Sequence, residues 1–302
     1  MKKTHTIRSG SIAGRTGYII HIGTLIPTYR LNDHDLVLFD SGRQEDPALI
    51  DYFEERGLRV EAVLLTHLHF DHTSNSRLLQ RHFGTKIYVG QAEMEGVFPP
   101  SRRDRTGRAE IPQIRDGKAM PYNFTMIPIG YEKKSIRIQD TDFAVEDLCG
   151  HTCGHLGYGT PDRVLCLGDA ILSPTMVELS KLPYFEYQEE SVDTMKSLLP
   201  TRYDYYALSH RDVVKACDMP ALVQKNIRRQ EQLRTDIIDL IEEPVEMDEL
   251  IDMIIYGLDI QLQSQETRRA AYASAVRYIE GMIRAGKLRL IPMNGMTLFA
   301  RQ

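Results

Sequence analysis

Thr66-His67-Leu68-His69-Phe70-Asp71-His72 is the stretch that decides the fold of this chain. It places three histidines and one aspartate within six residues, directly after the apolar run Ala62-Val63-Leu64-Leu65. That run reads as a short buried strand. A strand that ends in a tight turn can direct several short polar side chains to one point. Because neutral imidazoles and a carboxylate suit zinc and other divalent metals, the pattern predicts a metal site at the end of this strand.

Three later segments supply further polar residues for such a site. Gly150-His151-Thr152-Cys153-Gly154-His155 follows a predicted hairpin over residues 135–148. Val164-Leu165-Cys166-Leu167-Gly168-Asp169 reads as a buried strand that ends in an aspartate, and Ala207-Leu208-Ser209-His210 as a strand that ends in a histidine. We therefore expect these side chains to join the first cluster as partner ligands.

The order H-x-H-x-D-H, H, D, H resembles the metallo-β-lactamase superfamily of dinuclear metallohydrolases, over roughly residues 15 to 215. The resemblance implies an α+β fold, an αββα sandwich, with all seven ligand positions filled. It implies two divalent metal ions, zinc first and iron or manganese as alternatives. One ion takes His67, His69 and His151, the other takes Asp71, His72 and His210, and Asp169 bridges the two.

The chemistry of these residues agrees with that division. Three neutral imidazoles leave a divalent metal at its full charge with an open position, which suits the activation of water. Asp71 is expected to orient the attacking hydroxide and to return a proton to the leaving group, so it is the predicted catalytic residue. His155 and Asp40 are interpreted as residues that hold the ligands from behind rather than as ligands.

The substrate class is a wider question. Thr66 to His72 is similar to the first motif of acyl-homoserine lactonases and of the glyoxalase II thioesterases. Lactonases carry a tyrosine three residues after the bridging aspartate, where this chain has Leu172, and Tyr158 or Tyr184 are candidates to replace it. We expect hydrolysis of an ester, lactone or thioester. A metal-dependent nuclease or phosphodiesterase, or a DNA-binding metal-dependent regulator, is the alternative.

Composition restricts the partners. The chain has 302 residues, 26% charged and 42% hydrophobic, as in an ordinary globular protein. Its net charge of −5 does not favour nucleic acid or an anionic membrane. The N-terminal residues lack the apolar core of a signal peptide, and no run approaches membrane-spanning length. A cytoplasmic enzyme with a small-molecule substrate is expected, with a homodimer left open.

Residues 97–134 interrupt the regular pattern. This insertion holds five prolines and has eight basic residues against four acidic ones, a net charge of +4. A long loop in a compact domain is often functional. We interpret it as a lid that attracts an anionic substrate, with a surface excursion or dimer contact as equal alternatives. The candidate substrate contacts are Arg102, Arg103, Arg105, Tyr122 and Phe124.

The composition changes near residue 218, so a catalytic domain is predicted over 1–217 and an accessory domain over 218–302. Helical patterns cover 221–242, 245–256 and 267–285, and a hairpin surrounds Asn294-Gly295. This order resembles a winged helix. The basis for DNA binding is a basic cluster of Arg268, Arg269, Arg277, Arg284, Lys287 and Arg289. However, the domain has 11 basic and 13 acidic residues, which favours a role in packing or dimerisation.

Overall fold

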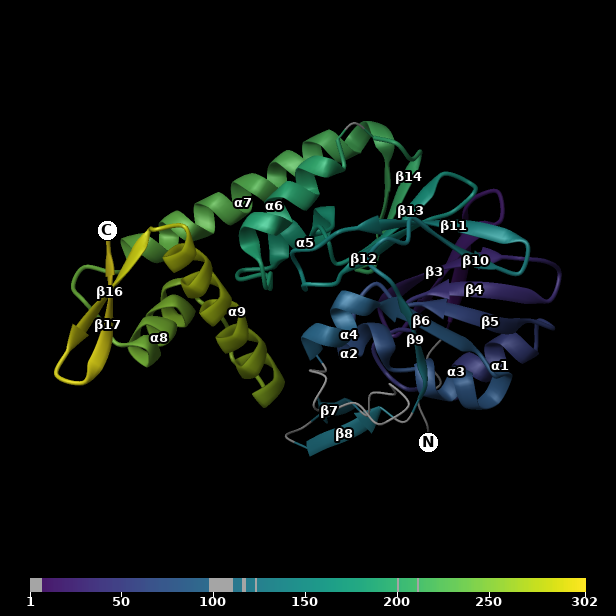
Figure 1. The fold of residues 1–302 in the computed structure, drawn as a ribbon, viewed down its shortest axis with the longest axis horizontal. Coiled ribbons are helices and arrows are strands. Elements are labelled where there is room, and N and C mark those ends of the chain that lie inside the picture. The colour runs from purple at the N-terminus through teal and green to yellow at the C-terminus, as the bar shows by residue number, and fades with distance from the viewer. Residues whose placement is uncertain (1–6, 98–110, 116–117, 123, 200, 211) are drawn as a thin grey trace.

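The computed structural model describes the whole chain except residues 1–6, 98–110, 116–117, 123, 200 and 211. Two β-sheets pack face to face and helices cover their outer faces, as Figure 1 shows. No helix in the described part of the chain is long and apolar enough to cross a membrane.

The first sheet has seven strands and is mixed. Its first four strands form antiparallel neighbours, and its last four run parallel. In order across the sheet they are β1 (Arg8–Ala13), β2 (Thr16–His21), β3 (Thr24–Arg30), β4 (Asp35–Phe39), β5 (Arg59–Leu64), β6 (Lys86–Gly90) and β9 (Met126–Ile129).

The second sheet has six strands. All neighbours are antiparallel except the fourth and fifth strands, which run parallel. In order they are β10 (Ser135–Ile138), β11 (Thr141–Asp147), β12 (Leu156–Gly159), β13 (Val164–Gly168), β14 (Tyr205–Leu208) and β15 (Asp212–Lys215).

Helices follow the strands of both sheets. Those of the first sheet are α1 (Ala48–Glu54), α2 (Phe70–Thr73), α3 (Ser76–Phe83) and α4 (Gln91–Val97). Those that follow strands of the second sheet are α5 (Pro174–Leu179), α6 (Gln188–Ser197) and, after a 3₁₀ turn at Ala216–Asp218, α7 (Met219–Asp239).

The sandwich follows from alternation along the central strands. In β5, Val63 packs with the helices outside the first sheet, while its neighbours Ala62 and Leu64 pack between the sheets. In β13, Cys166 packs between the sheets and Leu165 packs against the helices outside the second sheet. Because successive side chains of a strand point to opposite faces, strands that are apolar on both faces must be covered on both. The predicted αββα sandwich is confirmed.

The sequence predicts that residues 17–22 and 35–40 form two strands that pair with each other. In the structure, β3 lies between β2 and β4 and pairs with both. The sequence does not predict β3 because this strand contains Pro27. Proline lacks an amide hydrogen and therefore argues against an internal strand. The turn before β3 places Ile22 and Gly23 at φ 47° and 83°. A β-branched residue rarely adopts this conformation, so it gives no turn signal.

Residues 97–134 are not one long loop, because part of this insertion builds the first sheet. Strand β9 runs parallel to β6 at the sheet edge, where Pro128 is tolerated. A separate antiparallel hairpin consists of β7 (Ile111–Arg115) and β8 (Lys118–Tyr122). The interpretation of the remaining insertion as a lid stays a prediction.

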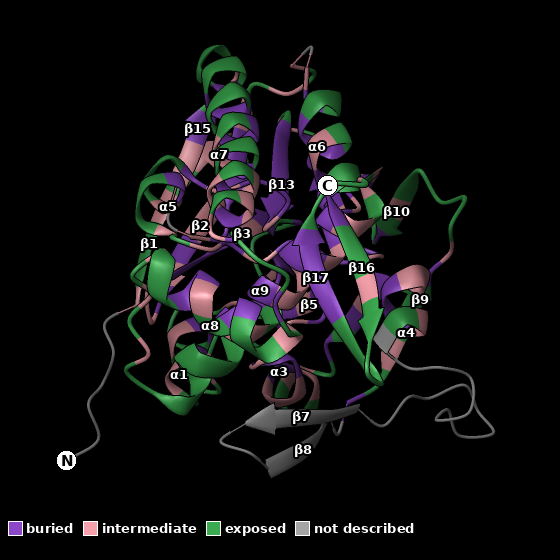
Figure 2. Cartoon of the chain, turned by 90° about the vertical axis from the view of Figure 1, so that its left-hand side faces the viewer, coloured by how far each residue is buried: buried purple, intermediate pink, exposed green. Residues whose placement is uncertain are grey.

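The C-terminal unit has a core of its own. It contains α8 (Met247–Gly257), α9 (Gln265–Arg284) and the hairpin of β16 (Leu288–Met293) and β17 (Met296–Arg301). Asn294 and Gly295 form the hairpin turn with φ of 51° and 81°, as the Asn-Gly signal predicts. Figure 2 shows β17 more buried than β16. The likeness to a winged helix stays a prediction.

Helix α7 belongs to both parts of the molecule, and Figure 1 shows it running from the sandwich to the C-terminal unit. Near its start, Met219, Leu222 and Val223 pack with the second sheet. Near its end, Leu233 and Ile237 pack in the core of the C-terminal unit. One continuous helix therefore contributes to two cores.

The two sheets are also linked at their edge by Asp162, and we predict a stability effect there. Its Oδ2 accepts hydrogen bonds from the backbone N–H of Arg15 at 2.7 Å, and from the N–H and hydroxyl of Thr16 at 2.9 and 2.8 Å. Asp162→Ala leaves the buried Thr16 N–H without this partner. The free energy of unfolding should fall by about 1–3 kcal/mol in urea titrations.

Asp142→Ala is the matched control for Asp162→Ala. Asp142 pairs with Arg137 at 3.0 Å, but both side chains are more than half exposed. Exposed pairs contribute at most about 1 kcal/mol. Equal losses in the two variants would contradict the structural role of Asp162.

Candidate metal centre

The predicted ligands gather at one edge of the sandwich, because the strands that carry them end there. His67 and His69 follow β5, and Asp71 and His72 lie on the short helix α2. Parallel strands β13 and β14 end just before Asp169 and His210. His151 precedes β12, which runs antiparallel to β13, so its loop reaches the same edge.

The first group of donors consists of three imidazoles. Nδ1 of His69 lies 2.9 Å from Nε2 of His67 and 3.0 Å from Nε2 of His151. Nδ1 of His151 lies 3.0 Å from the carbonyl oxygen of Tyr184. Because a carbonyl only accepts, the ring hydrogen of His151 sits on Nδ1, and Nε2 turns its lone pair toward the other two rings.

The second group is arranged around Asp169. Its Oδ2 lies 3.3 Å from Nε2 of His210, 3.4 Å from Nε2 of His72 and 3.7 Å from Nε2 of His151. Asp71 completes the group, with Oδ2 3.9 Å from Nε2 of His72. Asp169 therefore faces histidines of both groups, which is the position that a bridging ligand needs.

The electrostatics of the groups differ. Burial lowers the pKa of His67 and His151 well below its ordinary value, and neighbouring histidines lower it further, so these rings are neutral lone-pair donors. Burial also opposes a charge on His72, yet Asp169, Asp40 and Asp71 together raise its pKa well above the ordinary value. The carboxylates thus favour positive charge at this point, which a divalent ion supplies in place of a proton.

These donors fit two divalent metal ions. His67, His69 and His151 form one group, and Asp71, His72, Asp169 and His210 form another; the ligand atoms within a group lie within 4.8 Å of one another. Among the described side chains, Nε2 of His72 and Oδ1 of Asp169 are buried without a hydrogen-bond partner. Buried polar atoms rarely remain unpaired, and a cation between the carboxylate and the imidazoles satisfies both.

Asp40 lies behind the ligands. Its Oδ2 accepts from Nδ1 of His72 at 2.8 Å, which leaves Nε2 of His72 facing the centre. Its Oδ1 accepts from the backbone N–H of Thr66 at 2.8 Å, and the Thr66 hydroxyl lies 3.0 Å from Nδ1 of His67. Asp40 adopts φ 66°, a conformation that aspartate tolerates better than most residues. The carboxylate thus orients one predicted ligand, His72, directly and another, His67, through Thr66.

His155 is fully buried and also does not point at the centre as a ligand. Its Nε2 accepts a hydrogen bond from the backbone N–H of Asp169 at 3.1 Å, and its ring stacks on His67 with centroids 5.0 Å apart. Burial lowers its pKa to about 3, so the ring is neutral. Gly168 adopts φ 54° here, and a Cβ on it would lie 2.7 Å from Nε2 of His155. This glycine allows Asp169 to approach the histidine.

Glu93 is a residue of the site that sequence analysis missed. It is 1% exposed on α4, and its Oε1 accepts from the N–H of Leu68 at 2.9 Å. Its Oε2 accepts from the Thr152 hydroxyl at 2.7 Å and from the N–H of Gly154 at 3.1 Å. Burial raises its pKa, and these hydrogen bonds oppose the rise. Glu93 joins the loop of His67 and His69 to the loop of His151.

Four of the five predicted substrate contacts have side chains that are not described, and the fifth is packed in the core. Arg102, Arg103, Arg105 and the side chain of Tyr122 lie outside the described residues. Phe124 is 8% exposed and belongs to the core outside the first sheet, so its ring is packed rather than open to a substrate.

Of the two candidate tyrosines, one reaches the centre. Tyr158 is fully buried, and its hydroxyl donates to the carbonyl oxygen of Leu65 at 2.7 Å. Tyr184 is half-buried, and its ring packs edge-on against His69 and His151, with centroids 5.4 and 5.6 Å apart. Tyr184 therefore forms a wall of the site.

The basic cluster expected for DNA binding is divided. Arg268 and Arg269 are exposed on α9. Arg277 instead bonds Glu186 at 3.3 Å, and the guanidinium of Arg284 lies 5.9 Å from the ring centre of Tyr187. Arg277 is thus partly buried against the sandwich, whereas Arg284 stays exposed beside Tyr187.

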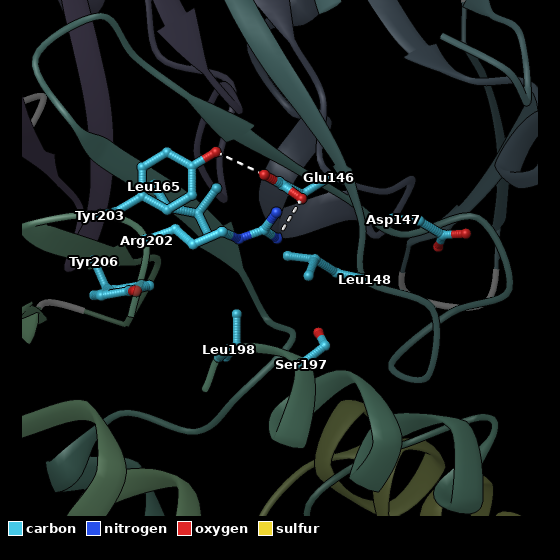
Figure 3. Close-up of a pocket in the computed structure, with 9 residues that line it drawn as sticks. All are labelled: Glu146, Asp147, Leu148, Leu165, Ser197, Leu198, Arg202, Tyr203 and Tyr206. Atoms are coloured by element: carbon cyan, nitrogen blue, oxygen red, sulfur yellow. Dashed lines mark hydrogen bonds and ion pairs between the residues drawn. The ribbon is translucent and has the colours of Figure 1, made fainter. Parts of the chain in front are cut away.

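A separate pocket, shown in Figure 3, is lined by residues of β11, β13 and α6 among others and by none of the histidines. Glu146 closes one side by accepting hydrogen bonds from Tyr203 at 2.7 Å and from Arg202 at 3.1 Å. The pocket has a volume of about 20 Å³, which is room for one water molecule, so it is not a substrate site.

Comparison with known families agrees with this geometry. The model of the metallo-beta-lactamase superfamily matches residues 26–210, more than half of the chain. The matched region includes all seven predicted ligands. The chain belongs to the metallo-beta-lactamase superfamily and is an enzyme with this metallohydrolase fold.

Several curated proteins are similar to this chain. Hydroxyacylglutathione hydrolase GloC of Haemophilus influenzae is 24% identical over 173 residues, which cover 57% of this chain and 78% of that protein. A hydroxyacylglutathione hydrolase of Shewanella loihica is 29% identical over 165 residues, covering 51% and 53%. The probable metallo-hydrolase YflN of Bacillus subtilis is 26% identical, covering 46% and 57%. The chain spans little more than half the length of the last two.

Solved structures share the fold over nearly the whole chain. A metallo-beta-lactamase family protein from Thermus thermophilus has a TM-score of 0.67 at 15% identity and covers 92% of this chain and 94% of its own. A beta-lactamase domain protein from Burkholderia ambifaria has a TM-score of 0.66 at 15% identity, covering 97% and 93%. The common architecture therefore extends beyond the two sheets.

We predict that Glu93→Gln disturbs the centre without touching a ligand. An amide group cannot accept at both ends, so an N–H donor of Leu68 or Gly154 then faces a second donor. The free energy of unfolding should fall by about 1–3 kcal/mol. The affinity for metal should fall about tenfold. Urea titration and chelator competition measure the two effects.

Glu189→Gln makes the same chemical change at an exposed position in the first turn of α6. It should leave both quantities unchanged. If Glu93→Gln behaves like this control, Glu93 does not hold the two loops together.

Proposed function

We propose that this protein is a dinuclear metal-dependent hydrolase that acts on a small acyl substrate, with a thioester as the first choice and an ester or lactone next. The observation that carries the proposal is the pair of donor groups around Asp169, three neutral imidazoles on one side and a carboxylate–histidine set on the other. The proposed ligands are His67, His69, Asp71, His72, His151, Asp169 and His210.

When bound, two divalent ions would polarise a scissile carbonyl and lower the pKa of water, with zinc as the metal to test first. The residues of the chain supply the rest. Asp71 is partly exposed, with a side-chain exposure of 28%, so its carboxylate can reach a water molecule and a leaving group. We assign it the role of accepting a proton from the attacking water and delivering it to the leaving group.

Orientation of substrate falls to side chains at the rim. The ring of Tyr184 lies against two proposed ligands, and Phe70 is 39% exposed between His69 and Asp71. These rings offer apolar surface to an acyl chain and keep bulk water away from that chain. Tyr184 takes the place that Tyr158 cannot, because the hydroxyl of Tyr158 is buried and already bonded.

The choice of a thioester rests on the relatives. The bond that a hydroxyacylglutathione hydrolase cleaves is a thioester, and several proteins of that name are similar to this chain, including those of Haemophilus influenzae and Shewanella loihica. An anionic substrate, a cytoplasmic location and a homodimer are further predictions from the sequence. Nucleic acid is the less favoured substrate, since Arg277 is paired with Glu186 and the C-terminal unit has more acidic than basic residues.

We predict that two aspartate variants separate metal binding from catalysis. Asp169→Ala removes the carboxylate that faces both groups, so metal content and activity should be lost together. Asp71→Asn keeps a ligand oxygen but not the base, so kcat should fall by at least about a hundredfold with a smaller loss of metal. Metal analysis and steady-state kinetics decide this, and an active Asp169→Ala enzyme would contradict the proposed centre.

A substrate panel tests the proposed class. The metal-loaded protein should hydrolyse hydroxyacylglutathione thioesters or short acyl esters and lactones, and should leave duplex DNA and phosphodiesters intact. Removal of metal by a chelator should abolish hydrolysis, and added Zn²⁺ should restore it. Cleavage of phosphodiesters without acyl hydrolysis would replace the proposal by the nuclease alternative.

A further inference from the structure

Residues 171–188 cross the open edge of the sandwich beside the ligands, and side chains from the C-terminal helices hold their outer side. Asn226 on α7 makes a pair of hydrogen bonds with the backbone of Leu172, at 3.0 and 3.1 Å. Lys181 reaches the Asp259 carboxylate at 2.7 Å. Arg234 donates to Oε1 of Gln188 at 3.0 Å. These contacts attach the segment to the C-terminal region at several points along its length.

The inner side of the same segment is bonded to the His151 loop. The carbonyl of Tyr184 accepts from Nδ1 of His151 at 3.0 Å. The N–H of Glu186 donates to the carbonyl of His151 at 3.2 Å, and the N–H of Tyr187 donates to that of Gly150 at 2.9 Å. Residues 184–187 therefore determine both the ring orientation of His151 and the position of its backbone.

Arg277 on α9 contacts this segment where it meets His151. Its guanidinium donates to Oε1 of Glu186 at 3.3 Å and to Oε2 of Glu280, one turn further along α9, at 2.8 Å. It also lies close enough to the hydroxyl of Tyr184 to oppose the rise in pKa that burial causes there. The side chain is 34% exposed, and that of Glu186 is 23% exposed, so water screens the pair only in part.

The close approach of α9 keeps this arrangement in place. A Cβ on Gly281 would lie 2.8 Å from Oε1 of Gln188, so the helix backbone lies directly against the start of α6 at this point. Arg277 precedes Gly281 by one helical turn and therefore projects from the same face. Its planar fork can bind two acceptors with a fixed separation, which lysine cannot do.

We propose that Arg277 is a positioning residue of the metal centre: from the C-terminal unit it fixes Glu186, and through the segment of residues 184–187 the orientation of His151. The C-terminal unit is then a structural part of the active site rather than a separate binding module. This inference rests on the proposed metal centre, but it does not depend on which substrate the enzyme hydrolyses.

The test compares Arg277→Ala, Arg277→Lys and Arg269→Ala in the full-length protein. Arg269 lies on the same helix and is exposed, and its replacement removes the same charge, so Arg269→Ala is the matched control. The dissociation constants of Zn²⁺ and Co²⁺ are measured by chelator competition, and the Co²⁺ absorption spectrum reports the ligand geometry. Residues that orient a metal-bound histidine typically change metal affinity by about ten- to a hundredfold.

Arg277→Ala should raise the dissociation constant of the more weakly bound of the two metal ions about tenfold, and it should alter the Co²⁺ absorption spectrum. Arg277→Lys should recover part of the affinity, because an ammonium can bond Glu186 but cannot hold Glu186 and Glu280 in the same fixed geometry. Arg269→Ala should match the wild type. With an active substrate, Arg277→Ala should lower kcat more than it changes KM.

Glu186→Gln provides a second variant if Arg277→Ala does not fold, since it keeps the shape of the segment and weakens only the ion pair. It should shift the metal affinity in the same direction by a smaller factor. Wild-type affinity and spectrum in both Arg277→Ala and Glu186→Gln would overturn the inference. A wild-type protein that binds two metals but hydrolyses no acyl substrate would refute the proposed function, while the affinity comparison would still decide the role of Arg277.

Discussion

A buried carboxylate surrounded by imidazoles is the interaction on which the rest of the site depends. Oδ2 of Asp169 has three histidine nitrogens within 4 Å, and its Oδ1 is buried without a hydrogen-bond partner. Charges removed from water are stable only when they are compensated. Because the pKa of His67 and of His151 is lowered, both rings are neutral and offer lone pairs. The pKa of His72 is raised, which shows that the nearby carboxylates favour a positive charge at this position.

The surrounding structure keeps these donors convergent without becoming part of the donor set. Asp40, Glu93 and His155 each bond a ligand or its loop, and all three are almost completely buried. They come from the end of β4, from α4 and from the loop before β12, so elements far apart in the chain restrain one point. Because each polar atom has few alternatives in a low-dielectric interior, a network of this kind favours a single geometry.

Local sequence patterns predicted strands that end in short polar side chains and the gathering of those side chains, and the resemblance to a known family implied the sandwich. Other features depend on tertiary contacts that have no local signal. Strand β3 contains Pro27, which argues against an internal strand, and β9 lies in a proline-rich insertion. Glu93 looks like any polar helical residue until the His151 loop folds over it. Arg277 belonged to a cluster that suggested DNA binding, and only the packing of α9 shows its ion pair with Glu186.

Helix α7 has a consequence for how the molecule responds to stress. Its first turns complete the core outside the second sheet, and its last turns complete the core of the C-terminal unit. Fraying at either end therefore removes apolar contacts from one core and loosens the support of the other. The two parts should therefore unfold in one cooperative transition. A chain cut near residue 218 would lose the α7 side chains that cover the second sheet, along with the C-terminal unit.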